Sequence, residues 1–149
     1  MVEQLIAFVT NKIVISTVIA LLIAQILKFI IHYIMKKEVD ISVLLFQYGG
    51  MPSSHSSFVM ALTTGIFMTE GITTTFIVCL GLSLIVIRDA IGVRKQIEQQ
   101  AKTLNKIIKA IKYKEFKGKY LKELVGHTPL QVLMGSLLGI LTTIIVFLN

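Results

Sequence analysis

The chain has 149 residues and the composition of a membrane protein. Hydrophobic residues make up 54% of it, charged residues 15%, and the mean hydropathy is +0.80, which is too apolar for a soluble domain of this size. The formal net charge is +7, and in so apolar a chain we expect this charge to face lipid phosphates rather than nucleic acid. The sequence therefore predicts a single integral membrane domain over residues 1–149.

Four apolar segments approach the roughly 20 residues that a helix needs to cross a bilayer. In chain order they are residues 13–34, 54–69, 73–91 and 130–148. The second is short, because its length at a helical rise covers about 24 Å of a hydrocarbon core about 30 Å thick. Its polar start should thus lie below the membrane surface. The predicted fold class is all-α, a bundle of four transmembrane helices.

Basic residues are concentrated between the third and fourth spans. Eleven of the 15 Lys and Arg residues fall between Arg88 and Lys122, against three acidic residues, and Lys36 and Lys37 follow the first span. Loops rich in Lys and Arg stay on the cytoplasmic side. This places the basic segment of about residues 93–125 in the cytoplasm and both termini outside. We expect a multi-pass plasma membrane protein.

The start of the basic segment has the pattern of an amphipathic helix. Apolar residues recur there at three- and four-residue spacing, with lysines mostly on other faces; the apolar set is Val93, Ile97, Ala101, Leu104, Ile108 and Ile111. This predicts a basic amphipathic helix at the interface, where each basic side chain gains about 1 kcal/mol near an anionic leaflet. The alternative is that the apolar stripe packs on the chain's own spans.

A polar and helix-breaking octet, Gly-Gly-Met-Pro-Ser-Ser-His-Ser over residues 49–56, precedes the second span. Ser53 or Ser54 can cap this helix. The free amide N–H groups at its start, together with the helix dipole, favour an anion. His55 lies within the first turn, so its ring can reach a bound anion. The alternative is an ordinary capped helix with a histidine at the interface.

A second histidine-containing motif precedes the last span, where the chain reads Gly126-His127-Thr128-Pro129. Thr128 and Gln131 fit a capping box with proline at the first helical position. His127 should therefore face the same membrane boundary as His55. A lone histidine there is usually interfacial, but two histidines at two capped helix starts favour a shared anion site.

Ionisable residues lie at the end of the third span, in the seven-residue sequence Arg88-Asp89-Ala90-Ile91-Gly92-Val93-Arg94. Charges at this depth are usually paired or functional. Arg88 or Arg94 can clamp phosphate oxygens while Asp89 orients one of them or a histidine, and Lys28 in the first span can complete the clamp. The alternative is a structural ion pair between Asp89 and Arg94. The acidic residues show no metal-ligand spacing with a histidine, so we expect no metal or cofactor.

These motifs resemble the phosphatidic acid phosphatase type 2 family, and most closely its divergent branch of small membrane proteins, over nearly the whole chain. The octet is similar to the family's Pro-Ser-Gly-His element, and Gly126-His127 with the following helix is similar to its nucleophile-bearing helix. The resemblance implies that His127 attacks phosphorus to give a phosphohistidine and that His55 protonates the leaving oxygen. It implies a phosphoric monoester hydrolase acting on a lipid phosphate, such as phosphatidate or a polyprenyl (di)phosphate.

Three positions depart from the family pattern. Gln131 stands where the family has an aspartate, Leu121 stands where it has an arginine, and Lys28 is followed by lysines instead of Arg-Pro. These departures leave open a non-enzymatic protein that binds or transports lipid phosphates. A third hypothesis is a membrane scaffold joined through the small-residue pattern of Gly135 and Gly139, although packing within one chain explains that pattern more simply.

Overall fold

The computed structural model describes residues 1–36, 50–110, 120–123 and 125–149, and every regular element in this part of the chain is an α-helix. The helices are α1 Val2–Val9, α2 Lys12–Lys36, α4 Ser54–Glu70, α5 Thr74–Ile91, α6 Val93–Ala110 and α7 Pro129–Leu148. Gly49 of the octet and residues 111–119 of the basic segment lie outside the described residues. The all-α fold class is confirmed.

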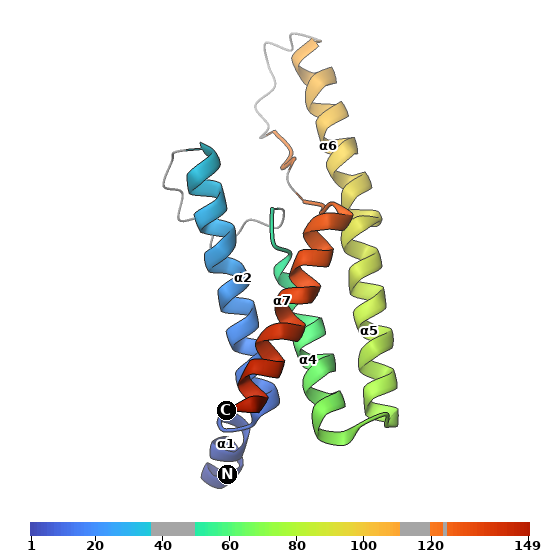
Figure 1. Ribbon diagram of the computed structural model, residues 1–149. Helices are drawn as coiled ribbons and strands as arrows, with labels where there is room; N and C mark the ends of the chain where they lie inside the picture. The colour runs from blue at the N-terminus through green and yellow to red at the C-terminus, as the bar shows by residue number, and fades with distance from the viewer. Residues whose placement is uncertain (37–49, 111–119, 124) are drawn as a thin grey trace.

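Four helices pack in alternating directions, so that both termini lie at one end (Figure 1). α2 and α5 run toward the α6 end of the molecule, and α4 and α7 run away from it. Among the described residues, three stretches are long and apolar enough to cross a membrane: Lys12–Met35, Thr74–Ala110 and Pro129–Leu148. α4 has 17 residues, which agrees with the short second span expected from the sequence.

α4 lies at the centre of the bundle, in contact with α2, α5 and α7. Small side chains let helices approach closely in a membrane, and the buried residues of α4 are mostly small: Ser54, Ser56, Ser57, Val59, Ala61, Thr63, Gly65 and Ile66. The Ser and Thr residues in this set include two that form hydrogen bonds to neighbouring helices. Ser57 Oγ donates to the Ala20 carbonyl oxygen at 3.1 Å, and Thr63 Oγ1 lies 2.8 Å from Ser83 Oγ. These contacts fix α4 against α2 and α5.

Two glycines of α7 bring its backbone against α4. A Cβ at Gly135 would lie 2.3 Å from the Ser53 carbonyl oxygen, and one at Gly139 would lie 2.2 Å from the Ser57 carbonyl oxygen. Neither position has room for a larger side chain. The small-residue pattern therefore serves packing within the chain, as its simpler interpretation predicted.

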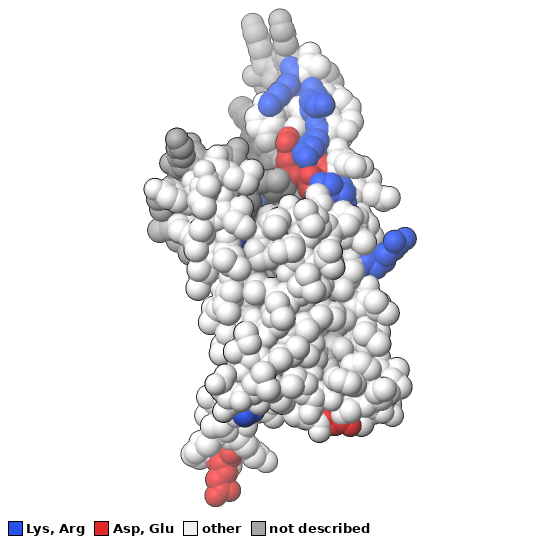
Figure 2. All heavy atoms as spheres, viewed as in Figure 1, with Lys and Arg blue, Asp and Glu red and all other residues white. Residues whose placement is uncertain are grey.

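α6 continues from α5 past the end of the bundle (Figure 1). Its buried residues are Glu98, Ala101 and Asn105, whereas its large apolar residues Val93, Ile97, Leu104 and Ile107 are exposed. The predicted apolar stripe is thus divided. Ala101 is buried against the chain, whereas Val93, Ile97 and Leu104 are exposed. Most of the Lys and Arg side chains seen in Figure 2 gather at the α6 end, above a bundle surface that is mostly uncharged.

Candidate functional site

His127 lies immediately before α7 and is almost completely buried, with an exposed fraction of 2%. Thr128 is the N-cap of α7. Its side chain accepts from the Gln131 N–H, and the Gln131 side chain accepts from the Thr128 N–H, which confirms the predicted capping box. The His127 N–H donates to the Ala90 carbonyl oxygen at 3.1 Å. The backbone of His127 is therefore held between α5 and α7.

The imidazole of His127 has one side-chain hydrogen-bond partner in the described part of the chain, and the Gly50 backbone also acts on the ring as an acceptor. Nδ1 lies 3.4 Å from Gln131 Oε1, and an amide oxygen only accepts, so the proton of the neutral ring is assigned to Nδ1. Nε2 then carries the lone pair; it is buried and has no hydrogen-bond partner among the described residues. Burial, followed by the charge of Lys28, lowers the pKa of His127 below 6.5, against smaller opposing effects of Gln131 and the Gly50 backbone. The ring is neutral at pH 7.

His55 is in the first turn of α4, at the same end of the bundle. Ser53 is the N-cap, and its side chain accepts from the Ser56 N–H at 3.4 Å. The Ser53 N–H itself donates to the Gln131 carbonyl oxygen at 3.0 Å. The N–H groups of Ser54 and His55 come next, and the first turn of a helix offers no backbone acceptor to them. They are the amide donors available to an anion at this helix start.

Charged side chains from three helices act on the half-buried ring of His55. They are Arg94 of α6, Lys28 of α2 and Asp89 of α5. The charge of His55 in turn acts on His127. Electrostatic interactions of this kind weaken with distance, so the structure brings both histidines and these three groups together at one end of the bundle.

Lys28 is a buried cation beside the start of α4. Its exposed fraction is 2%, and its Nζ donates to Ser54 Oγ at 3.3 Å. Moving an ammonium group out of water costs several kcal/mol, and the α4 N-terminus adds partial positive charge close by. An anion between Lys28 and the α4 amides would interact favourably with both.

Asp89 and Arg94 form an ion pair through Arg94 Nε and Asp89 Oδ2. This is the structural ion pair that the sequence left open as an alternative. It joins the end of α5 to the start of α6 and leaves both side chains about one-third exposed. Among the described residues, no three His, Cys, Asp or Glu side chains come together in a way that could hold a metal ion.

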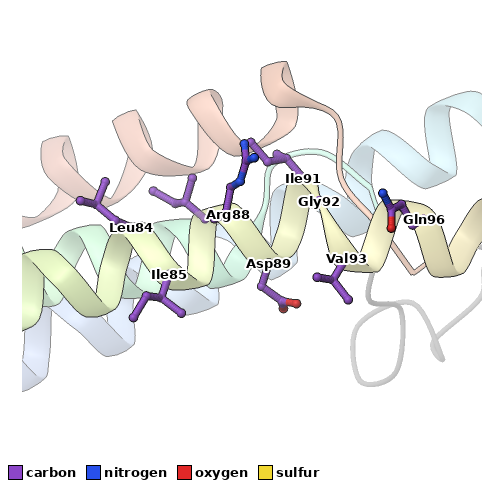
Figure 3. Close-up of a pocket in the computed structure, with 9 residues that line it drawn as sticks. Leu84, Ile85, Arg88, Asp89, Ile91, Gly92, Val93 and Gln96 are labelled. Carbon is purple, nitrogen blue, oxygen red and sulfur yellow. The ribbon is translucent and has the colours of Figure 1, made fainter.

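Arg88 projects from a different side of α5 than its neighbour Asp89 (Figure 3). It is exposed and lines a groove of about 930 Å³ along α5 and the start of α6, among mostly apolar residues. Arg88 is also absent from the charges that act on either histidine. Of the two candidate arginines, only Arg94 is among the charges that act on a histidine, and that histidine is His55.

Sequence reasoning missed the contacts that support the segment before His127. Glu98 and Asn105 are buried on one face of α6 and bond to this segment. Together with Ala101 they form a stripe of three- and four-residue spacing, which periodicity could have found. The sequence interpretation considered apolar residues only, so of this stripe it named Ala101 alone.

The fold and this cluster define a helical membrane protein with two histidines at one bundle end. Residues 9–142 match the sequence model of the Divergent PAP2 family. Over 151 aligned residues the chain is 37% identical to the uncharacterized membrane protein YuiD of Bacillus subtilis (strain 168), with 91% of this chain and 94% of that protein covered. The chain therefore belongs to the Divergent PAP2 family, as its motifs predicted. No solved structure matches it.

Proposed function

We propose that this protein hydrolyses a lipid phosphate, such as phosphatidate or a polyprenyl (di)phosphate, through a phosphohistidine at His127. The observation that carries the proposal is the buried Nε2 of a neutral imidazole, with no hydrogen-bond partner among the described residues, close to a buried lysine and a second histidine. Such an arrangement suits nucleophilic attack on an anion. Membership of the Divergent PAP2 family supports the same chemistry.

The phosphate would be bound by cations and amides at the start of α4. Lys28 and Arg94 supply positive charge, and the N–H groups of Ser54 and His55 supply hydrogen-bond donors. Such donors stabilise the charge that develops on the phosphoryl oxygens in the transition state. The lipid chains would remain in the membrane while the headgroup enters the bundle end.

The reaction needs the two histidines in different roles. His127 Nε2 attacks phosphorus and forms an N–P bond, while the bond from phosphorus to the lipid oxygen breaks. For a monophosphate, protonated His55 donates its proton to that oxygen and the lipid leaves as a neutral alcohol; for a diphosphate, the bond to the bridging oxygen breaks, that oxygen takes the proton, and the lipid leaves as its monophosphate. Neutral His55 then takes a proton from water, whose oxygen attacks phosphorus. The N–P bond breaks, inorganic phosphate leaves, and His127 is regenerated with its proton on Nδ1.

A second candidate function is binding or transport of lipid phosphates without hydrolysis. It is favoured by Gln131, because a neutral amide holds His127 where the family has a carboxylate. An amide orients the ring but cannot stabilise an imidazolium by charge. Leu121 at the position of the family's arginine has the same implication.

Phosphate release from purified protein tests the two functions. Wild type and His127→Ala would be compared on phosphatidate, a polyprenyl phosphate and a polyprenyl diphosphate in detergent micelles containing a metal chelator. His32→Ala is the matched control, because His32 is on α2 and outside the cluster. We expect release by wild type and His32→Ala alone, with acid-labile phosphate trapped on both.

Two results would decide against hydrolysis at His127. Undiminished release by His127→Ala would contradict the nucleophile. A wild type that binds these lipids, loses binding in Lys28→Met and Arg94→Met, and releases no phosphate would establish the binder instead.

The cytoplasmic placement of the site in the plasma membrane is part of the proposal and is supported by the basic segment. In a Cys79→Ser background, Lys106→Cys on α6 should resist a membrane-impermeant maleimide until cells are opened. Glu3→Cys on α1 is the control and should react in intact cells. Rapid labelling of Lys106→Cys in intact cells would place the site outside.

A further inference from the structure

The segment that leads into His127 lies directly against α6. A Cβ at Gly126 would be 2.5 Å from the Lys95 Cα and 2.7 Å from its backbone nitrogen. Only glycine allows this approach. The Gly126 N–H donates to Glu98 Oε2 at 3.2 Å in a buried environment. The residue immediately before the proposed nucleophile is therefore bonded to a side chain of α6.

Glu98 divides its two oxygens between the helix and this segment. Oε1 accepts from Lys95 Nζ at 2.8 Å and from Lys102 Nζ at 2.6 Å, and Oε2 accepts from Gly126. Burial alone would raise the pKa of Glu98, but the hydrogen bonds from Lys102 and Lys95 lower it to about 2. The carboxylate is thus charged and held in one orientation, although its exposed fraction is only 3%.

Asn105 makes a second attachment two turns further along α6. Its Oδ1 accepts from the Leu121 N–H at 3.0 Å, and its Nδ2 donates to the Leu121 carbonyl oxygen at 2.9 Å. Nδ2 also donates to Glu123 Oε1 at 2.8 Å. The described residues from Leu121 to Gly126 are therefore attached to α6 near both ends of the segment.

We propose that Glu98 is a positioning residue that holds His127 in place for attack through Gly126. The catalytic part of this inference rests on the proposed phosphatase function. Glu98 and Ala90 accept from the Gly126 and His127 N–H groups and so fix the backbone that leads into the His127 Cα, while Gln131 orients its ring. A misplacement of about 1 Å costs about 10²-fold in rate, so the anchor matters although Glu98 does not touch the substrate.

Kinetics of purified full-length protein in detergent micelles containing phosphatidate test this role. Glu98→Met fills the same space without an acceptor, and Glu98→Gln keeps an oxygen for the Gly126 N–H. Gln99→Ala, an exposed neighbour on α6, is the matched control. We expect kcat to fall about 10- to 100-fold in Glu98→Met with KM changed less than about 2-fold. Glu98→Gln should recover most of the rate.

A kcat in Glu98→Met equal to that of Gln99→Ala would overturn the proposal. So would an equal loss in Glu98→Met and Glu98→Gln, because the carboxylate would then act by charge alone. If Glu98→Met does not fold, Asn105→Ala loosens the same segment at its far end. It should lower kcat in the same direction, and an unchanged kcat would count against the role.

A second readout does not depend on turnover. Diethyl pyrocarbonate modifies accessible neutral histidines, and mass spectrometry reports each site. His127 should react slowly in wild type and Gln99→Ala, and at least about 10-fold faster relative to His32 in Glu98→Met once its anchor is lost. Unchanged protection would overturn the positioning role even in a protein without phosphatase activity. Increased reactivity with no wild-type turnover would retain the anchor and reject the proposed function.

Discussion

The two histidines differ in where each stands relative to the cap of its helix. His55 follows the cap Ser53, so it lies within the first turn of α4 and is half-buried. His127 precedes the cap Thr128, so its backbone lies outside α7 and bonds to Ala90 instead. Two helix starts that look alike in sequence therefore hold their rings by different means.

This difference bears on the two roles that we propose for the histidines. A residue within the first turn has its position set by the helix, which suits the exchange of protons with a substrate oxygen that we propose for His55. A residue before the cap takes its position from tertiary contacts. Those contacts bury and orient His127, which suits the nucleophilic role that we propose for it.

The largest expected effect is the loss of the nucleophile. His127→Ala should reduce phosphate release by more than about 10⁴-fold, because the proposed phosphohistidine forms on His127. Lipid phosphate binding should survive through Lys28 and Arg94. Equilibrium binding measured beside single-turnover release checks both statements, and a variant that loses binding along with activity would place His127 in substrate recognition.

Removal of the proton donor should have a smaller effect that depends on the leaving group. His55→Ala should slow hydrolysis of alkyl phosphates about 10²- to 10⁴-fold. Aryl phosphates, whose leaving groups need no proton, should be affected much less. Rates for a series of phosphate esters measure this dependence, and equal losses for all leaving groups would contradict the acid role of His55.

A substitution at a single glycine should disrupt the close packing of α7 against α4. Gly135→Ala places a Cβ against the Ser53 carbonyl oxygen and should destabilise the protein by about 1–3 kcal/mol. It should also lower activity, because Ser53 begins the helix that carries His55. Gly81→Ala is the control, since a Cβ there meets nothing within 4 Å. Unfolding in detergent micelles compares the two, and equal stabilities would contradict the close packing.

The smallest expected effect is on the pH dependence of phosphorylation. Because the pKa of His127 is lowered, the neutral ring should persist as the pH falls below 6.5. The positive charges that act on it come from Lys28 and His55. Lys28→Met removes one of these charges, so the pKa of His127 should rise. The loss of phosphorylation rate on the acid side of the pH–rate profile should then begin at a higher pH. Single-turnover phosphorylation between about pH 5 and about pH 8 measures this profile, and a shift to lower pH would contradict this account.

The helix starts could be predicted from the sequence because caps are local. Ser53 and the Thr128–Gln131 capping box connect groups three residues apart, so the pattern of side chains suffices to find them. The ends of the helices could also be predicted approximately from the sequence, since an apolar run ends where polar residues begin. This local information also located both histidines at helix starts.

Which side chains meet was decided by the tertiary structure. Arg88 and Arg94 were equal candidates by spacing, but six residues apart they project from different faces of a helix, and only packing brings Arg94 to His55. The hydrogen-bond partners of Glu98 and Asn105 were also beyond local pattern, because they lie 28 and 16 residues away. The non-helical backbone before His127 needs hydrogen-bond partners when it is buried, and the face of α6 that supplies them exists only once the chain has folded.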